Sequence, residues 1–407
     1  MTQTSAEAPE VLGPDFFRDP YPHYARFREQ APVVRVGMGP MPVWLVVRYA
    51  EARAALTDHR LVKDQDLMAK AAAAQAGVAH MPSRAERSFG ERVLTSHLLA
   101  MDPPDHTRLR GLVGRAFTMH RLRLLKPRIA KVAEGLLDAV DGQPEVDLLT
   151  ALAYPMPVMV LCELLGVPGE DQIQFRDQCV ALNEASADTM GPIAEEMAQL
   201  VLSWIARRRA NPGEDLLTDL IQVLDHEGGI SEEELVSMIF QVMSAGSGPS
   251  SHLIGNGMLS LLKNPEQLAL LRADRSLLSG AVDEFARYET TVHISMPWVA
   301  ADALDLGGVS IAAGDLVMVA NGSANRDPAQ FPDPDTFDIR RSTAGHIGFG
   351  HGIHHCLGAS LGKLIAEAAV TALLDRYDRI ELAVPSEEIT HKMFPARLLE
   401  RLPLLVG

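Results

Sequence analysis

The longest helical pattern in this sequence covers residues 231–264, and it limits the possible folds more than any other feature. Ser231 and Glu234, three positions apart, predict a capping box at its start, and Asn264-Pro265 predicts its end. A helix of about 32 residues spans roughly 48 Å, enough to cross a whole domain. Because much of its surface is apolar, we expect it to be buried on several sides.

The middle of this pattern, QVMSAGSGPSSH at 241–252, contains residues that helix interiors avoid. Gly246, Gly248 and Pro249 lie within four positions, and a proline costs about 3 kcal/mol inside a helix. Since Pro249 has no N–H, the carbonyl of Ala245 should lack its helical partner. The simple interpretation is a kink, and the alternative is that this carbonyl borders a functional site.

The composition excludes several classes of protein. A net charge of −16 without blocks of like charge argues against nucleic acid or an acidic membrane as a partner. Cys162 and Cys179 lie in apolar helical contexts and are expected to be buried and reduced. The N-terminus has no signal-like character, and two prolines and a glutamate interrupt the longest apolar run, 149–168. We therefore expect a soluble, cytoplasmic protein with no membrane span.

Periodicity along the chain predicts an α+β fold in which helices dominate. No repeat, low-complexity linker or clean boundary divides the sequence, so residues 1–407 are expected to form a single domain. The expected elements are an N-terminal helix at 19–30, a strand pair at 33–48, a helix at 49–58, an irregular stretch at 61–100, mostly helix over 106–285, strands at 297–321, and an irregular stretch at 326–338.

The sequence FGHGIHHCLGASLGKLIAEAAV, 349–370, contains the strongest chemical signal. Phe349 and two glycines predict a tight loop before Cys356, and a helix is expected from about 358 to 374. A cysteine at a helix N-terminus should have a lowered pKa, because the helix dipole and free N–H groups stabilise the thiolate. The small residue Gly358 would let a flat ligand lie against this helix.

The loop alone leaves three interpretations open. Cys356 could be a thiolate ligand of haem, or a buried structural cysteine in a glycine-rich turn. A zinc site with His351, His354 and His355 is the third, although zinc usually takes ligands from separated pairs.

The loop resembles the haem-binding signature of the cytochrome P450 family, F-G-x-G-x-H-x-C-x-G. The positions that match are Phe349, Gly350, Gly352, His354, Cys356 and Gly358. Other landmarks resemble the family in order between residues 20 and 360. They are the C helix at 101–118, the E-x-x-R pair as Glu284 and Arg287, the meander at 326–341, and, at 242–251, the I helix in which the family has A-G-x-D/E-T.

This resemblance implies the triangular, mostly helical cytochrome P450 fold with a small β-rich N-terminal part. It implies one haem b between the I helix and the helix that follows Cys356, with Cys356 as the axial thiolate ligand. Glu284 and Arg287 would form a buried structural pair. The other residues expected at the haem are His106, Arg110 and His354 at a propionate, together with Trp298, Phe349, Gly350 and Gly358.

The implied function is a monooxygenase that hydroxylates or epoxidises a small, largely apolar, natural-product-like substrate. Electrons would come from NAD(P)H through ferredoxin reductase and ferredoxin. Arg108, Arg115 and Lys363 could dock an acidic redox partner. The substrate pocket is expected to draw on residues 61–100, 175–195, 242–246, 292–294 and 393–394.

The chain departs from the family pattern at two structural positions. The meander has Thr336 where relatives have an arginine that supports the E-x-x-R pair, and Arg340 or Arg341 could compensate. Trp298 stands where many relatives have a propionate-binding arginine. Tryptophan can donate one hydrogen bond but has no charge, which leaves propionate anchoring open.

A third departure concerns the oxygen side of the haem, where the family's acid–alcohol pair falls on Gly248 and Pro249. That pair delivers protons in ordinary relatives. Ala245 and Gly246 complete this wall, and Ser250, one helical turn after Gly246, is a candidate substitute hydroxyl; Ser247 is a weaker one. The alternative functions are redox-neutral cyclisation, oxidative coupling or peroxide-driven oxidation, and a haem sensor without catalysis.

Overall fold

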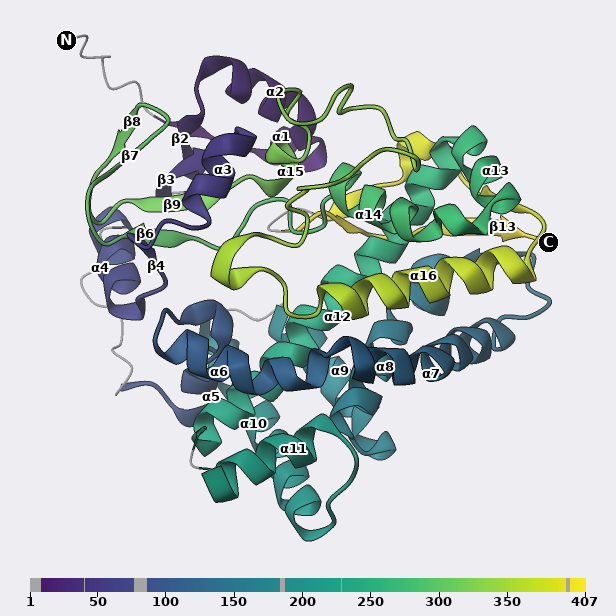
Figure 1. Cartoon of the computed structure of the whole chain (residues 1–407), viewed down its shortest axis with the longest axis horizontal. Coiled ribbons are helices and arrows are strands. Elements are labelled where there is room, and N and C mark those ends of the chain that lie inside the picture. The colour runs from purple at the N-terminus through teal and green to yellow at the C-terminus, as the bar shows by residue number, and fades with distance from the viewer. Residues whose placement is uncertain (1–8, 40, 77–85, 184–186, 228, 393–395) are drawn as a thin grey trace.

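The computed structural model describes residues 9–39, 41–76, 86–183, 187–227, 229–392 and 396–407. Helices form most of the molecule, and the larger sheet lies at one corner beside the N-terminal helices (Figure 1). The predominantly helical α+β class expected from the periodicity is confirmed.

The α-helices over the described ranges include the long element expected at 231–264. In chain order they are α1 Pro14–Arg18, α2 Pro20–Gln30, α3 Tyr49–Ala55, α4 Gln65–Ala76, α5 Phe89–Val93, α6 Asp105–Gly114, α7 Met119–Asp138, α8 Pro155–Leu165, α9 Gly169–Asn183, α10 Ala187–Ala210, α11 Leu216–Gln222, α12 Glu232–Lys263, α13 Pro265–Ala273, α14 Leu278–Tyr288, α15 Asn321–Ala324 and α16 Ala359–Arg376. Short 3₁₀ or π turns include η2 Leu98–Ala100, η3 Arg115–Phe117, η4 Leu149–Ala153, η5 Val223–Glu227, η6 Arg275–Leu277, η7 Gly352–His354 and η8 Ser386–Glu388.

The strands are short and come from both ends of the chain. They are β1 Glu10–Val11, β2 Val33–Met38, β3 Met41–Val46, β4 Leu61–Val62, β5 Glu145–Asp147, β6 Trp298–Ala300, β7 Leu304–Leu306, β8 Val309–Ile311, β9 Leu316–Val319, β10 Ile380–Leu382, β11 His391–Lys392, β12 Leu398–Leu399 and β13 Pro403–Val406. The larger sheet has the order β1-β2-β3-β9-β6-β4. The expected antiparallel pair β2–β3 is confirmed, and β3 pairs in parallel with β9, so this sheet is not built from the N-terminal part alone.

Helix α12 is the central element of the helical body. Its N-cap Ser231 forms the expected capping box with Glu234, and Asn264 ends it. It packs against α5, α8, α10, α14 and α16. Residues 235–240 and 251–261 are buried, but residues 244–250 between them include no buried residue. The middle of this central helix therefore borders an internal space.

Helix α4 lies in a stretch for which the sequence predicted no regular structure. Residues 61–100 were expected to be irregular, but α4 forms there because its sequence QDLMAKAAAAQA is rich in strong helix formers.

Cys162 is buried and has a free thiol, as predicted, and its burial raises its pKa to about 12. The side chain of Cys179, on α9, lies outside the described part of the structure. Among the described helices, none combines the length and apolar character that a bilayer span requires.

Candidate active site

Cys356 lies at the end of a tight loop that runs into α16. Gly350 and Gly352 have φ angles of 75° and 71°, a region that favours glycine. A Cβ on Gly352 would lie 2.3 Å from the carbonyl oxygen of Leu56, so this position also lacks room for a side chain. The N–H of Cys356 donates to the carbonyl of Phe349 at 2.8 Å, which closes the loop. The predicted loop and following helix are confirmed.

The loop and α12 form opposite walls of one cavity. The Cys356 side chain is exposed on one wall, and Ala245, Gly246, Pro249 and Ser250 of α12 lie on the other. Gly350, His354 and Gly358 also line the cavity, as do Phe349, Trp298, His106 and Arg110. The cavity thus brings together the residues that the sequence assigned to one site, except Gly248.

The thiol does not have the lowered pKa expected from the helix N-terminus. Protein atoms crowd Cys356 on every side except the cavity, and this desolvation raises its pKa. The N–H of Gly358 and the charge of Arg110 act in the opposite direction but do not overcome it. In addition, α16 begins at Ala359, three residues after the thiol, so the helix dipole acts from a distance.

The cavity wall has positive and hydrogen-bonding groups without acidic ones. Lys63, His106, Arg110 and His354 line it, and none of its described lining residues is Asp or Glu. The rings of His106 and His354 are 4.6 Å apart, edge to face. Nε2 of His106 and both ring nitrogens of His354 are buried and have no hydrogen-bond partner among the described residues. Buried polar atoms are normally paired, so this wall is suited to an anionic guest.

The cysteine loop contains His354 and also contacts Arg110 of α6. Arg110 donates to the carbonyl oxygen of His355 at 2.7 Å, which ties α6 to the cysteine loop. Burial, with the nearby charges of His106, Lys63 and Arg110, lowers the pKa of His354 to about 3. His354 is therefore neutral at pH 7 and can donate one N–H to a carboxylate. Arg110 and His354 can therefore donate to the carboxylate edge of a haem, and Cys356 lines the same cavity.

Lys63 is a cavity residue that the sequence analysis missed. It follows β4, only 4% of its surface is exposed, and its ammonium lies 3.7 Å from the centroid of the Trp298 ring. Strand β4 pairs with β6, and this pairing brings Lys63 to Trp298 across more than half of the chain. No spacing in the sequence predicts that contact, because it depends on a non-local strand pair.

The small residues in the middle of α12 differ in the space around them and in whether they line the cavity. A Cβ on Gly246 would lie 2.8 Å from Leu161 of α8, whereas the same position at Gly248 meets nothing within 4 Å. The Ser247 hydroxyl donates to the carbonyl of Ser244, and Ser247 is not among the lining residues. Ser250 lines the cavity, and over the described ranges its hydroxyl makes no hydrogen bond. Of the two serines considered from the sequence, Ser250 therefore lies at the cavity and Ser247 does not.

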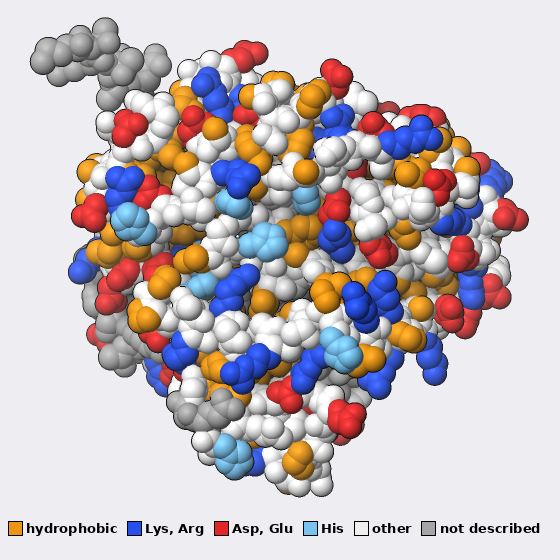
Figure 2. All heavy atoms as spheres, in the orientation of Figure 1, with side chains coloured by type: hydrophobic (Ala, Val, Ile, Leu, Met, Phe, Trp, Pro, Cys, Tyr) orange, Lys and Arg blue, Asp and Glu red, His pale blue; other side chains and the backbone are white. Residues whose placement is uncertain are grey.

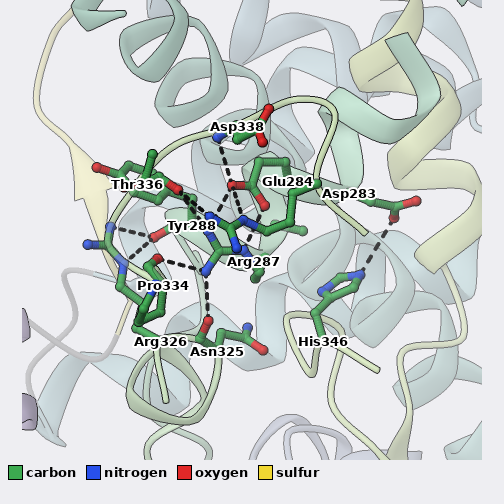
Figure 3. Close-up of polar contacts among 12 residues, drawn as sticks. Asp283, Glu284, Arg287, Tyr288, Asn325, Arg326, Pro334, Thr336, Asp338 and His346 are labelled. Carbon is green, nitrogen blue, oxygen red and sulfur yellow. Dashed lines mark hydrogen bonds and ion pairs between the residues drawn. The ribbon is translucent and has the colours of Figure 1, made fainter. Parts of the chain in front are cut away.

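Glu284 and Arg287 form the buried pair that the resemblance implied. Both side chains are 0% exposed, and two N–O contacts of 2.6 and 2.7 Å join them. Figure 3 shows Arg287 donating to the carbonyls of Asn325 and Pro334 in the meander. Every charged atom of this pair thus has a partner, so it joins α14 to the segment before the cysteine loop.

The meander supplies a second arginine, Arg341, one of the two candidates considered from the sequence. Nε of Arg341 lies 3.5 Å from Oε1 of Glu284, and its side chain donates to the carbonyls of Asp333 and Thr336. The Thr336 backbone also accepts from Arg287. Of the two arginines considered from the sequence, Arg341 therefore compensates, and exposed Arg340 does not.

The basic residues considered for docking have partners within the chain. Arg108 pairs with Glu234 and Asp105, and Lys363 donates to Asp283 at 2.7 Å. Figure 2 shows Lys, Arg and His side chains gathered over the central part of the face where α6, α7 and α16 lie in Figure 1. This face is basic locally, although the whole chain is acidic.

The remaining expectations concern zinc and the substrate pocket. Within the described ranges, no three His, Cys, Asp or Glu side chains are arranged to hold a metal ion by themselves. Lys63, Leu98 and Leu99 line the cavity from 61–100, and Val242 and Val292 also contribute. No described residue of 175–195 lines it, and residues 393–394 lie outside the described part.

Comparison with known proteins agrees with this site. The sequence profile of the cytochrome P450 family matches residues 172–400. The chain is 41% identical to cytochrome P450 107B1 of Saccharopolyspora erythraea over 99% of its own length and 100% of the relative's. It is 42% identical to the cytochrome P450 monooxygenase PikC of Streptomyces venezuelae, over 97% and 92% of the two chains. The tirandamycin C-bound P450 monooxygenase TamI superposes with a TM-score of 0.89 at 39% identity, covering 98% of this chain and 100% of TamI.

These matches extend over nearly the whole chain and include the central helix, the buried Glu284–Arg287 pair and the cysteine loop. Relatives of this kind use small-molecule substrates and redox partners. The chain therefore belongs to the cytochrome P450 family, and it is a haem-thiolate monooxygenase of that family.

Proposed function

We propose that this enzyme, one domain over residues 1–407, binds haem b and hydroxylates or epoxidises a largely apolar, natural-product-like substrate. The observation that carries the proposal is the cavity itself. It has an exposed thiol, a cationic edge without acidic residues, and a largely apolar remainder. Haem b has the matching features, namely an iron that takes a thiolate, two carboxylates at one edge and an apolar ring.

The residues around the cavity have separate roles in this proposal. Cys356 would hold the haem iron through its sulfur, and the haem-thiolate group, when bound, would supply the activation of dioxygen. His106, Arg110 and His354 hold a propionate, since each can donate to it. Phe349 lies beside the thiolate.

Gly350 and Gly358 leave room for the ring on the thiolate side. Trp298 lies near the carboxylate edge. These assignments are consistent with their common cavity, and each can be tested by substitution.

The substrate would lie against the apolar part of the cavity. Leu98, Leu99, Met238, Val242 and Met296 line this part. PikC, a similar protein, is a monooxygenase, and another relative at 38% identity is a 6-deoxyerythronolide B hydroxylase. A medium-sized, largely apolar product of a biosynthetic assembly line is therefore the substrate class that we favour.

Proton delivery is the part of the site that departs most from the family. Gly248 and Pro249 cannot supply an acid and an alcohol. Ser250 is the residue of α12 that brings a hydroxyl to this wall of the cavity, and we assign it to hold or pass a proton there, alone or with the hydroxyl of a substrate. Ala245 and Gly246 form the rest of the wall, and the Ala245 carbonyl can accept from a water.

The same departure supports a second candidate, in which the haem pocket performs a reaction without the standard proton relay. Redox-neutral cyclisation, oxidative coupling and peroxide-driven oxidation belong to this group. The open space around Gly248 is compatible with either candidate.

Electrons would reach the site on the thiolate side from NAD(P)H, through a ferredoxin reductase and a ferredoxin. The locally basic face over α6, α7 and α16 supports an acidic partner of this kind (Figure 2). Because Arg108 and Lys363 already pair within the chain, docking would exchange some of these contacts for contacts with the partner.

The test has two stages. The haem-loaded enzyme is reduced and exposed to CO, with Cys356→Ala as control; a thiolate-type Soret band in the wild type alone is expected, and its absence there would contradict the assignment. A panel of macrolide-type substrates is then incubated with ferredoxin, its reductase and NADPH, with peroxide, or with no oxidant. Oxygenated product only in the first condition supports the main candidate, whereas product in the others supports the second.

A further inference from the structure

Lys63 is a buried cation at the wall of the cavity. Its ammonium donates to the carbonyl oxygens of Met296 at 3.1 Å and Pro297 at 2.7 Å, and its third neighbour is the Trp298 ring. Within the described residues no carboxylate forms an ion pair with it. The nearest acid, Asp102, instead accepts the Lys63 backbone N–H at 2.7 Å. A buried ammonium is costly without an anion, and burial lowers the pKa of this one to about 7.

The position of Lys63 indicates which anion it would meet. Lys63 lines the same cavity as His106, Arg110 and His354, and the rings of His106 and His354 are 4.6 Å apart there. These four residues come from three separate parts of the chain: the end of β4, helix α6 and the cysteine loop. Such a convergence of donors without acids is suited to a carboxylate rather than to a neutral group.

The Trp298 ring and the backbone before it hold the Lys63 ammonium in position. The ring face attracts an ammonium, and the two carbonyls before it orient the N–H groups. The uncharged Trp298 cannot replace an arginine, but it can hold the charge of Lys63 near the position from which an arginine would act.

We propose that Lys63, held against Trp298, is a positioning residue that binds a carboxylate of haem b. The proposal rests on the proposed haem site and adds to it a residue outside the family signature. The source of the carboxylate is the haem rather than the substrate, because Lys63 shares its cavity with His106, Arg110 and His354, the residues assigned to a haem propionate.

The experiment measures how fast the holoenzyme loses haem to excess apomyoglobin. Lys63→Met should accelerate loss roughly 10- to 100-fold, the effect of removing one charged hydrogen bond. Lys63→Arg should remain near the wild-type rate, and so should the control Lys70→Met, an exposed lysine on α4. Reconstitution with haem dimethyl ester, which has no free carboxylates, should bring Lys63→Met and wild type to equal rates.

Several outcomes would overturn the proposal. Unchanged haem loss in Lys63→Met would do so, as would an equal acceleration with the dimethyl ester, which would indicate a structural role. Weaker binding of myristate, measured by its spectral shift, together with unchanged haem loss would reassign Lys63 to a substrate carboxylate. If Lys63→Met does not fold, Lys63→Gln removes the charge and keeps N–H donors for the two carbonyls.

The CO spectrum separates this proposal from the proposed function. A thiolate-type band in every variant that retains haem, together with unchanged haem loss, would contradict only the role of Lys63. Failure of the wild type to give that band would contradict the haem-thiolate site itself.

Discussion

Arg287 lies against Glu284 on one turn of α14, and two N–O contacts of 2.6 and 2.7 Å join their fully buried side chains. The remaining N–H groups of Arg287 reach the meander, and Glu284 also accepts the N–H of Asp338 (Figure 3). The pair therefore acts as a joint between α14 and the segment that leads to the cysteine loop. It lies away from the cavity, so its function is structural.

Removal of either partner should be strongly destabilising. Arg287→Ala leaves the Glu284 carboxylate buried without its charge partner, and the expected loss in free energy of unfolding is about 3–5 kcal/mol. Urea unfolding and the yield of haem-loaded protein measure this loss. The matched control is Arg379→Ala, which breaks an exposed pair with Glu381. A loss no larger than in this control would contradict the structural role.

Arg341 should matter more than its neighbour Arg340. Arg341 is 12% exposed and holds three meander carbonyls together beside Glu284, whereas Arg340 is exposed. Arg341→Ala should lower the free energy of unfolding by about 1–3 kcal/mol, because it removes a positive charge beside the buried Glu284 carboxylate together with these hydrogen bonds. Arg340→Ala should change it by under about 0.5 kcal/mol. Equal effects in urea unfolding would show that Arg341 does not compensate for Thr336.

These two arginines also illustrate what the sequence could predict. Local signals succeeded: the Ser231 capping box, the glycine loop before Cys356 and the E-x-x-R pair all depend on residues close in sequence. The choice of Arg341 over Arg340 required the path of the meander. The contact of Lys63 with Trp298 required the pairing of β4 with β6, and pairings at such sequence separation have no local signature.

The same distinction explains the two errors. A lowered pKa for Cys356 followed from the helix N-terminus alone, but the pKa depends on the desolvation by the whole loop. Helix α4 has little amphipathic spacing, so periodicity did not reveal it, although its alanines favour a helix.

Two glycines of α12 should respond oppositely to alanine. A Cβ on Gly257 would lie 2.3–2.7 Å from three ring atoms of Phe285, so Gly257→Ala should destabilise the protein by about 1–3 kcal/mol. The space beside Gly248 is open, and alanine favours a helix over glycine, so Gly248→Ala should stabilise by about 0.5–1 kcal/mol. Thermal unfolding of both variants tests this contrast, and a shift of the same sign in both would contradict it.

Acid should destabilise the fold through buried histidines outside the cavity. Burial lowers the pKa of His293 and His391 to about 3 and that of His97 to about 4. Above pH 6.5 these groups are neutral in both states, so they have no effect on stability. Below pH 6.5 the unfolded chain takes up protons that the folded protein refuses, and the free energy of unfolding falls until about pH 3–4.

Single variants can show how much each buried histidine contributes to the fall in the free energy of unfolding with decreasing pH. Each buried histidine contributes up to about 1.4 kcal/mol per pH unit. His97→Leu should make the decline between pH 6.5 and pH 4 shallower by nearly that amount, because it removes the buried imidazole whose pKa is lowered to about 4. The control is His59→Gln, at an exposed position, which should leave the slope unchanged. Urea unfolding at several pH values measures the slope, and equal slopes in all three proteins would exclude His97 as a source.

The oxygen-side wall of α12 offers the most direct test of the proposed reaction. Ser250 lines the cavity, and its hydroxyl makes no hydrogen bond to another described residue, whereas Ser251 donates to the carbonyl of Ser247 and is buried away from the cavity. If Ser250 supplies protons, Ser250→Ala should lower product formed per NADPH by at least about tenfold, with peroxide released instead. Ser251→Ala should leave product per NADPH unchanged.

Pro249→Thr adds a hydroxyl and restores the N–H opposite the Ala245 carbonyl, so it should raise product per NADPH. If Pro249→Thr abolishes product while haem content and the CO spectrum stay normal, the missing pair is a requirement of a different reaction, and the second candidate replaces the first.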